Sequence, residues 1–298
     1  MIDAVILWTD GAEVSMAAKL KDYVPRKLAR CEDVAAPTRF SSMGEIKRCV
    51  ASIRKFAPFI DRIFIVTDAQ DPGIEGVIIV DHREIYRGYE HLLPIFSSRS
   101  IETMIWRIPG LSERFIYFND DFILRRPCLE SDFFEGSSLV CRAQRFNLPL
   151  TRLLSLFEAN AGYKTTLASS ASLLGYRWSY LYTGHLPHPQ FRSLLEGYYL
   201  ENEGIMLDNA GERFRSSAQF NPAALGYLLA ERRGRLILKS RHDSELYYKY
   251  RNRRNYTQRK LSYFDTREDA LALCFNSLDL APEQDIKMVL EWIDNLLK

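Results

Sequence analysis

The chain lacks the features that would place it outside the ordinary class of globular proteins. Its 298 residues include five cysteines, without a C-x-x-C pair or a histidine at zinc-ligand spacing, so we expect neither a disulfide framework nor a zinc site. No stretch approaches the roughly 18 apolar residues of a membrane-spanning helix, and the N-terminus lacks the basic region of a signal peptide. These absences predict a cytoplasmic protein in a reducing compartment, with any membrane contact peripheral to the inner face of the cytoplasmic membrane.

Common nucleotide-binding signatures and a large net charge are also missing. The chain has no P-loop G-x-x-x-x-G-K-[ST] and no G-x-G-x-x-G after its first apolar run, which removes the main support for a kinase or a dehydrogenase. Its 40 basic and 38 acidic residues give a net charge of +2, so we expect no nucleic-acid partner. With 47% hydrophobic residues, the chain is able to bury a core.

Short apolar runs alternate with segments of helical spacing in the first half of the chain. Strands are expected at 4–8, 62–67, 76–80 and 114–118, and helices at 45–56 and 98–108. This alternation predicts an α/β fold with a mostly parallel, Rossmann-like sheet flanked by helices.

Each predicted strand is followed by a turn that carries aspartate. These residues are Asp10, Asp68, Asp81 and the pair Asp120 and Asp121. In open α/β sheets, ligands bind at the carboxyl ends of the strands. The sequence therefore predicts a polar, cation-binding cleft at this edge of the sheet.

The second half of the chain is helical and aromatic in pattern. Helices are expected at 153–157, 191–199, 222–230 and 286–297. Because no low-complexity linker separates the two halves, we expect a single domain over residues 1–298, with a helical insertion closing over the first half.

Residues 231–260 carry eleven Lys or Arg against three acids, interleaved with tyrosines. Such a run is often a solvated surface. It is equally typical of a binding face for an anionic polymer or an anionic membrane.

Asn119-Asp120-Asp121 is the strongest local signal for chemistry. Two adjacent carboxylates repel each other unless a cation lies beside them, and a hard divalent ion that holds a nucleotide diphosphate is a natural occupant. The alternative is a turn or a helix N-cap. His185 and His188 flank a proline and are candidates for a general base or a phosphate ligand, or for a rigid surface loop.

Four blocks of the chain, in order, resemble the Stealth family of sugar-1-phosphate transferases. Residues 2–11 are similar to the family's block D-x-V-[YI]-x-W-V-D-G, and residues 39–134 to its long second block, which ends in F-N-D-D. The third block is represented by Pro187-His188 and Arg213-Phe214-Arg215, and the fourth by residues 273–276. Two positions depart from the pattern: Ser277 stands where the family usually has Asp, and Ala51 where it commonly has Arg.

The resemblance implies a GT-A-like fold and a specific reaction in capsule or surface polysaccharide biosynthesis. A sugar-1-phosphate passes from a nucleotide-diphosphate sugar (UDP-GlcNAc or similar) to a hydroxyl of a glycan or polysaccharide acceptor, which forms a phosphodiester and releases a nucleoside monophosphate. Residues 1–140 would bind the nucleotide sugar, 141–260 would face the acceptor, and 261–298 would return to the core.

The resemblance also assigns roles to individual residues. The catalytic residues would be His188, Arg215 and Asp121, and the ligands of Mg²⁺ or Mn²⁺ would be Asp120, Asp121 and Asn276. The donor would be bound by Asp10, Gly11, Arg39, Glu45, Lys47, Ser98 and Asn119.

Two other functions are compatible with the same residues. A metal-dependent glycosyltransferase would use the acids in the same way but would release a nucleoside diphosphate. A non-catalytic polysaccharide-assembly protein would keep the fold without turnover, and the departures at Ser277 and Ala51 favour it.

Overall fold

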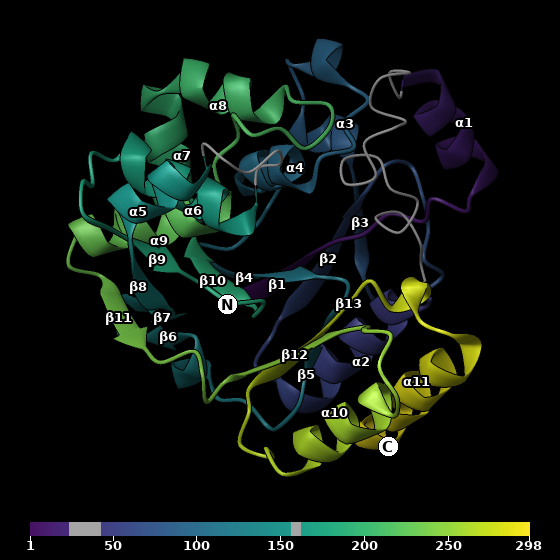
Figure 1. Ribbon diagram of the computed structural model, residues 1–298. Helices are drawn as coiled ribbons and strands as arrows, with labels where there is room; N and C mark the ends of the chain where they lie inside the picture. The colour runs from purple at the N-terminus through teal and green to yellow at the C-terminus, as the bar shows by residue number, and fades with distance from the viewer. Residues whose placement is uncertain (24–42, 156–161) are drawn as a thin grey trace.

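A five-stranded sheet forms the centre of the protein (Figure 1). The computed structural model describes residues 1–23, 43–155 and 162–298. The strand order is β10-β4-β1-β2-β3, in which β4, β1, β2 and β3 are parallel and β10 is antiparallel to β4. The strands are β1 (Ile2–Leu7), β2 (Arg62–Thr67), β3 (Ile78–Asp81), β4 (Arg114–Asn119) and β10 (His188–Phe191). The predicted α/β fold with a mostly parallel sheet is confirmed.

The central strands are buried because they are covered on both faces. Every residue of β1 is buried, as expected for a parallel strand with a continuous apolar run. The register pairs Leu7 with Val66 on one side and with Asn119 on the other. The carboxyl ends of β1, β2 and β4 therefore meet at one edge of the sheet.

Two groups of helices enclose this sheet, and Figure 1 shows them on opposite sides. The first group is α2 (Glu45–Phe56), α10 (Tyr256–Asp265) and α11 (Glu283–Leu297), in which α11 packs on both of the others. The second group is α4 (Ser98–Met104), α6 (Tyr163–Leu173), α7 (Arg192–Glu201), α8 (Glu203–Ala210) and α9 (Pro222–Arg232). The predicted helix 45–56 is confirmed over its full length, and Ile46, Cys49, Val50, Ile53 and Phe56 are buried on its inner face.

The segment 141–260 contains strands that its periodicity does not predict. The helix expected at 191–199 begins one residue later, because Phe191 is the last residue of β10. Pro189 lies within this strand, and β10 tolerates it as an edge strand of the sheet. The helix expected at 153–157 ends at Ser155 in α5 (Leu148–Ser155), and residues 156 and 157 lie outside the described part of the chain.

A smaller sheet brings the C-terminal part of the chain to the end of β4. Its order is β12-β13-β5, with β5 (Phe122–Leu124), β12 (Glu245–Lys249) and β13 (Ala272–Asn276). Cys274 pairs with Phe122, and the Phe275 N–H donates to the Asp121 carbonyl at 3.2 Å. Asn276 is thereby carried to the turn that holds Asp120 and Asp121.

The remaining elements complete the two helical layers and the rims. They are α1 (Val14–Tyr23), α3 (His82–Ile85), β6 (Phe134–Glu135), β7 (Ser138–Arg142), β8 (Gln144–Asn147), β9 (Ser179–Tyr182) and β11 (Leu236–Lys239), with short 3₁₀ turns at Glu90–Leu92, Ile105–Arg107, Glu130–Asp132 and Leu278–Leu280. The four cysteines in the described residues are free and buried, and Cys31 lies outside them. No helix among the described residues has the length and apolar character needed to cross a membrane.

A buried ion pair links β1 to β2 at the edge opposite the predicted cleft. The Asp3 carboxylate is fully buried and accepts hydrogen bonds from Arg62 at 2.8 and 3.0 Å and from the Ser112 N–H at 2.8 Å. We expect Asp3→Ala to lower the free energy of unfolding by about 3 kcal/mol, because a buried, hydrogen-bonded charge pair is broken. Denaturant unfolding measures the change.

The exposed pair Arg114–Glu130 provides the control. Glu130→Ala should cost less than about 1 kcal/mol, since water already screens both groups. An equal loss of unfolding free energy in Asp3→Ala and Glu130→Ala would show that the Asp3 pair has no special role in joining the strands.

Candidate active site

A cleft of about 680 Å³ opens at the carboxyl ends of the parallel strands. It is bounded by the ends of β1, β2 and β4, by α3 and α4, by the segment before β10 and by the end of β13. The predicted site residues that line it are Glu45, Ser98, Asn119, Asp120, Asp121, His188, Arg215 and Asn276. Residues that lie far apart in the sequence, from Glu45 to Asn276, therefore meet in one cleft.

The acid pair lies in the two-residue turn between β4 and β5. Burial raises the pKa of Asp121 to about 6, and burial together with the charges of Asp121 and Glu45 holds the pKa of Asp120 well above its usual range. Glu45 lines the same wall, and its pKa is also raised, mainly by burial. Three carboxyl groups thus share a poorly hydrated space in which their negative charges are mutually unfavourable.

The donor atoms of this wall fit a hard divalent cation. Asp121 Oδ1 is buried without a hydrogen-bond partner in the described structure, while Asp121 Oδ2 accepts from the Cys274 thiol at 3.3 Å. Asn276 Oδ1 faces the cleft and accepts from the Ser277 hydroxyl at 2.9 Å. Carboxylate and amide oxygens are the ligands that Mg²⁺ and Mn²⁺ prefer.

The protein atoms alone do not form a complete metal site. Among the described residues, no group of three or more His, Cys, Asp or Glu side chains is arranged to hold a metal ion. Mg²⁺ commonly binds to one or two carboxylates and takes its other ligands from water and substrate phosphates. The acid pair therefore fits a metal that arrives with a phosphorylated substrate.

Two arginines, the buried Arg99 and the half-buried Arg215, line the cleft together with the acid wall. Arg99 and Arg215 both line the cleft, and burial together with the positive charge of Arg215 lowers the pKa of Arg99 to about 10. Burial raises the pKa of Glu102 to about 7, although Tyr117 and both arginines lower it. Two guanidinium groups with a single carboxylate between them leave an excess of positive charge, which suits an anionic ligand.

The sequence pattern did not identify Arg99, Glu102 or Tyr117 as site residues. Arg99 and Glu102 lie on α4, three positions apart, so that both reach the cleft from one face of the helix. The Tyr117 hydroxyl donates to Asn119 Oδ1 at 2.5 Å and fixes that side chain. Glu102 and Tyr117 belong to the matched second block, as does Ser98 next to Arg99, and this match was the available signal.

His188 is held in an aromatic environment at the start of β10. Its ring is 6% exposed, stacks on Tyr117 with centroids 6.2 Å apart, and has Nδ1 3.3 Å from the Tyr227 hydroxyl. Burial lowers the pKa of His188 to about 3, so the imidazole is neutral at physiological pH. His185 lies between Tyr163 and Tyr247, with centroids 5.2 and 4.7 Å away.

Three predicted donor-binding residues, Asp10, Gly11 and Lys47, do not line the cleft in the described structure. Asp10 caps its own turn by accepting from the Ala12 N–H at 2.9 Å, and Gly11 follows it at the rim beside the cleft-lining Thr9. Lys47 is exposed on the outer side of α2, and Arg39 lies outside the described residues.

The two departures from the family pattern lie in different environments. Ala51 is exposed on α2 and does not line the cleft. Ser277 lines the cleft with a positive φ of 54° and donates to Asn276, so it positions the amide although it brings no charge.

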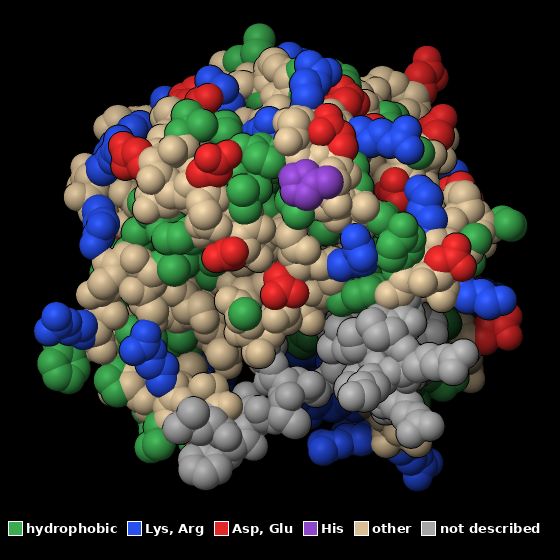
Figure 2. Space-filling model, turned by 90° about the horizontal axis from the view of Figure 1, so that it is seen from above, with side chains coloured by type: hydrophobic (Ala, Val, Ile, Leu, Met, Phe, Trp, Pro, Cys, Tyr) green, Lys and Arg blue, Asp and Glu red, His purple; other side chains and the backbone are tan. Residues whose placement is uncertain are grey.

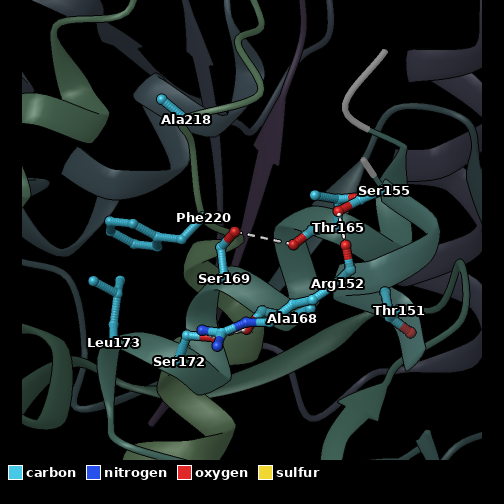
Figure 3. A pocket seen from close by; sticks show the side chains of 10 residues that line it. All are labelled: Thr151, Arg152, Ser155, Thr165, Ala168, Ser169, Ser172, Leu173, Ala218 and Phe220. Atoms are coloured by element: carbon cyan, nitrogen blue, oxygen red, sulfur yellow. Dashed lines mark hydrogen bonds between the residues drawn. The ribbon is translucent and has the colours of Figure 1, made fainter. Parts of the chain in front are cut away.

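A second, smaller pocket of about 410 Å³ lies between α5 and α6 (Figure 3). Hydroxyl side chains and Arg152 line it, and Phe220 closes one side. Its serines mostly donate to carbonyl groups of their own helices, as Ser169 does to Thr165. It lacks an acid pair and is separate from the chemistry of the larger cleft.

Sequence comparison relates the chain to a family of known transferases. Residues 39–141 match the family profile described as Stealth protein CR2, conserved region 2. The chain is 29% identical to the receptor polysaccharide phosphotransferase WefC of Streptococcus oralis and 28% identical to the capsular polysaccharide phosphotransferase WcwK of Streptococcus pneumoniae. Each match covers 74% of this chain and 75% of the relative.

Among solved structures, the chain resembles an active-site mutant of the galactosyltransferase LgtC. The TM-score is 0.44 and the identity 9%, over 98% of this chain and 95% of the other. The site and the sequence relatives define the chain as a transferase. Within that class, it belongs to the Stealth family.

The repulsion within the acid wall predicts an opposition between stability and metal binding. A carboxyl group whose pKa is raised by folding destabilises the folded protein once it is ionised. We expect Asp120→Asn to raise the free energy of unfolding of the metal-free protein by about 1 kcal/mol and to weaken Mn²⁺ binding at least tenfold. Thermal unfolding in chelator and calorimetric titration measure the two effects.

Asp61, an acid at the opposite edge of the sheet, is the matched control. Asp61→Asn should leave Mn²⁺ binding unchanged. A metal-free Asp120→Asn protein that is less stable than the parent would contradict the proposed repulsion.

The neutral state of His188 predicts a pH dependence of stability. Because its folded pKa of about 3 lies below the usual 6.5, its contribution is present above pH 6.5 and is lost as the pH falls toward 3. We expect the parent to lose about 1.4 kcal/mol more per pH unit than His188→Asn between pH 6 and pH 4. Denaturant unfolding at several pH values gives the two slopes.

His91 is exposed and serves as the control. The unfolding free energy of His91→Asn should change with pH at the same slope as that of the parent. Parallel slopes for the parent and His188→Asn would mean that His188 is not buried in its neutral form.

Proposed function

We propose that the chain transfers a sugar-1-phosphate from a nucleotide-diphosphate sugar to a hydroxyl of a glycan acceptor, in capsule or surface polysaccharide biosynthesis. The reaction forms a phosphodiester and releases a nucleoside monophosphate. The observation that carries the proposal is the cleft itself, in which the acid pair Asp120 and Asp121 shares one space with the arginines Arg99 and Arg215. The names of the relatives, which are polysaccharide phosphotransferases, support the same class of reaction.

The acid wall would hold Mg²⁺ or Mn²⁺ through Asp120, Asp121 and Asn276. The bound ion would neutralise negative charge on the diphosphate of the donor. A bound cation would relieve the repulsion among the carboxyl groups. The same cation would also attract the diphosphate, so we expect metal and donor to favour each other's binding.

The arginines would bind the phosphoryl group that is transferred. Arg215 donates to the Ser98 hydroxyl at 2.9 Å, which fixes the guanidinium inside the cleft. In a largely dissociative transfer, charge spreads over the equatorial phosphoryl oxygens, and preorganised arginine donors stabilise it. Arg99 adds a second positive charge beside Arg215.

His188 would accept the proton of the acceptor hydroxyl. The acceptor oxygen forms a bond to the β-phosphorus, the bond from that phosphorus to the bridging oxygen breaks, and the nucleoside monophosphate leaves. Nδ1 of His188 contacts Tyr227, which leaves Nε2 for the substrate. The approach of an anionic phosphoryl group favours protonation of an imidazole whose own pKa is low.

The remaining predicted residues would serve the donor. Glu45, Ser98 and Asn119 line the cleft, where they would contact the bound donor. Asp10, Gly11 and Lys47 belong to the proposed donor-binding set through the family pattern, although they lie outside the cleft lining. Arg39 belongs to it through the same pattern and lies outside the described residues. We also propose that 1–140 binds the donor, that 141–260 faces the acceptor, and that 261–298 completes the core.

The basic segment 231–260 is proposed as a contact for an anionic polymer or membrane. Several of its arginines are used inside the fold, such as Arg241 in its ion pair with Glu245. Arg251, Arg253 and Arg254 are exposed, close in sequence to the cleft-lining Lys249. On the face seen in Figure 2, acidic and basic side chains are interspersed. The exposed arginines are therefore a local feature, suited to a peripheral partner at the inner membrane face.

The leaving group distinguishes phosphotransfer from glycosyl transfer. We expect incubation with nucleotide sugars, Mn²⁺ and a glycan acceptor to release nucleoside monophosphate, with a product heavier than the acceptor by one sugar phosphate. Mass spectrometry and nucleotide chromatography measure both. Asp121→Ala and His188→Ala should reduce turnover to background while thermal unfolding stays cooperative, and Asp61→Asn should remain active.

The other outcomes select the competing functions. Release of nucleoside diphosphate would identify a glycosyltransferase. Metal-dependent binding of a nucleotide sugar without turnover on any acceptor would identify a non-catalytic assembly protein. Near-normal turnover in His188→Ala would remove that residue from proton transfer.

A further inference from the structure

Arg215 lies in a segment of irregular backbone. Residues 211–221, between α8 and α9, form neither helix nor strand. A guanidinium group on such a segment is not fixed by a regular backbone ladder, although the proposed transfer requires it to meet the phosphoryl oxygens closely. A displacement of about 1 Å at such a contact can cost a hundredfold in rate, so side chains must hold this segment in place.

Gln219 is buried in this segment and uses its whole side-chain amide. It is 1% exposed. Its Oε1 accepts from the Ser97 hydroxyl and from the Ser216 N–H, both at 3.1 Å. Its Nε2 donates to the Ser100 hydroxyl at 2.8 Å and to the Asn209 carbonyl at 3.1 Å. A glutamine amide has two N–H donors and an oxygen with two lone pairs, so all of its hydrogen-bonding capacity is occupied.

The orientation of this amide is fixed by its backbone partners. The Ser216 N–H can only donate, and the Asn209 carbonyl can only accept. Turning the amide by half a revolution would place its N–H groups against a donor and its oxygen against an acceptor. Gln219 therefore holds the Ser216 backbone in a single position.

The same amide joins this segment to the start of α4. Ser216 directly follows Arg215, and Ser97 directly precedes Ser98. Arg215 Nη2 in turn donates to the Ser98 hydroxyl at 2.9 Å. The amide thus bridges the chain neighbours of the two residues whose hydrogen bond fixes the guanidinium inside the cleft.

We infer that Gln219 is a positioning residue for Arg215 and that it acts in the transfer reaction only through that arginine. Neither Gln219 nor Ser97 lines the cleft, so neither touches a substrate there. Without the amide, the Ser216 N–H loses its acceptor and must turn toward another one, which displaces the adjacent Arg215. The inference rests on the proposed function, in which Arg215 binds the phosphoryl group.

A second anchor keeps the segment folded when the amide is removed. The Phe96 N–H donates to the Arg213 carbonyl at 2.8 Å, and Arg213 Nε donates to the Pro94 carbonyl at 3.0 Å. Neither bond involves Gln219. Gln219→Met, which nearly conserves the volume of the side chain, should therefore shift the segment locally without unfolding the protein.

A double-mutant cycle measures whether the amide acts through the arginine. The donor is UDP-GlcNAc, or whichever nucleotide sugar the parent turns over fastest, with Mn²⁺ and a glycan acceptor. We expect Gln219→Met to lower kcat roughly tenfold to a hundredfold and to change KM for the donor less than about threefold, because a displaced guanidinium stabilises the transition state less. In the Arg215→Ala background, the same substitution should change kcat by less than about twofold.

Gln190→Met is the matched control for the loss of a buried amide. Gln190 is also 1% exposed and donates to the Ala223 carbonyl at 3.1 Å, and in the described structure it has no hydrogen bond to residues 211–221. Its replacement should leave kcat within about twofold of the parent. Thermal unfolding of every variant shows that it is folded at the assay temperature.

Ser97→Ala is a second, smaller variant, and it decides the question if Gln219→Met does not fold. It removes the hydroxyl that donates to Gln219 Oε1 and should lower kcat roughly threefold to fivefold in the parent, but not beside Arg215→Ala. Equal fold-losses in the parent and in the Arg215→Ala background would overturn the positioning role while leaving the proposed transfer intact. Unchanged kcat in both Gln219→Met and Ser97→Ala would overturn it as well. A parent that releases no nucleoside monophosphate would instead remove the proposed function.

Discussion

The mutual repulsion of buried carboxyl groups at the end of β4 is the constraint on which the site depends. Asp120, Asp121 and Glu45 share one wall of the cleft, and the pKa of each is raised. The fold maintains this unfavourable arrangement because the sheet beneath is rigid and buried on both faces. Arg99 and Arg215 add two positive charges, which Glu102 compensates only in part. A ligand with both cationic and anionic parts satisfies both groups at once.

The order of the strands and helices along the chain determines where the acidic, basic and imidazole groups of the cleft lie. The parallel strands supply the acid pair from one edge of the sheet, while α4 and the segment that contains Arg215 supply the positive charge. β10 runs antiparallel to its neighbour, and His188 is the first residue of that strand. The imidazole is therefore presented at the same edge as the carboxyl ends of the parallel strands. A donor that lies across these strands passes every one of these groups in turn.

Local pattern was sufficient for part of the fold and part of the site. The run at 62–67 and the helical spacing at 45–56 gave the correct elements, because long apolar patterns reflect burial directly. The strands β5 and β10 were not predicted, since they are three and four residues long and β10 contains proline. Arg99 has no distinguishing pattern in the sequence, because its role arises only from the tertiary contacts that bury it in the cleft.

The pairing of β13 with β5 determines when this cleft comes into existence. Cys274 and Asp121, which it brings into contact, are 153 residues apart in the sequence. Contacts of such long range form late, after the local and sequential parts of a chain have folded. During synthesis, the parallel sheet emerges from the ribosome well before the strand that covers its acid pair. A growing chain therefore has no closed cleft until β13, which ends at Asn276, has been translated and has paired with β5.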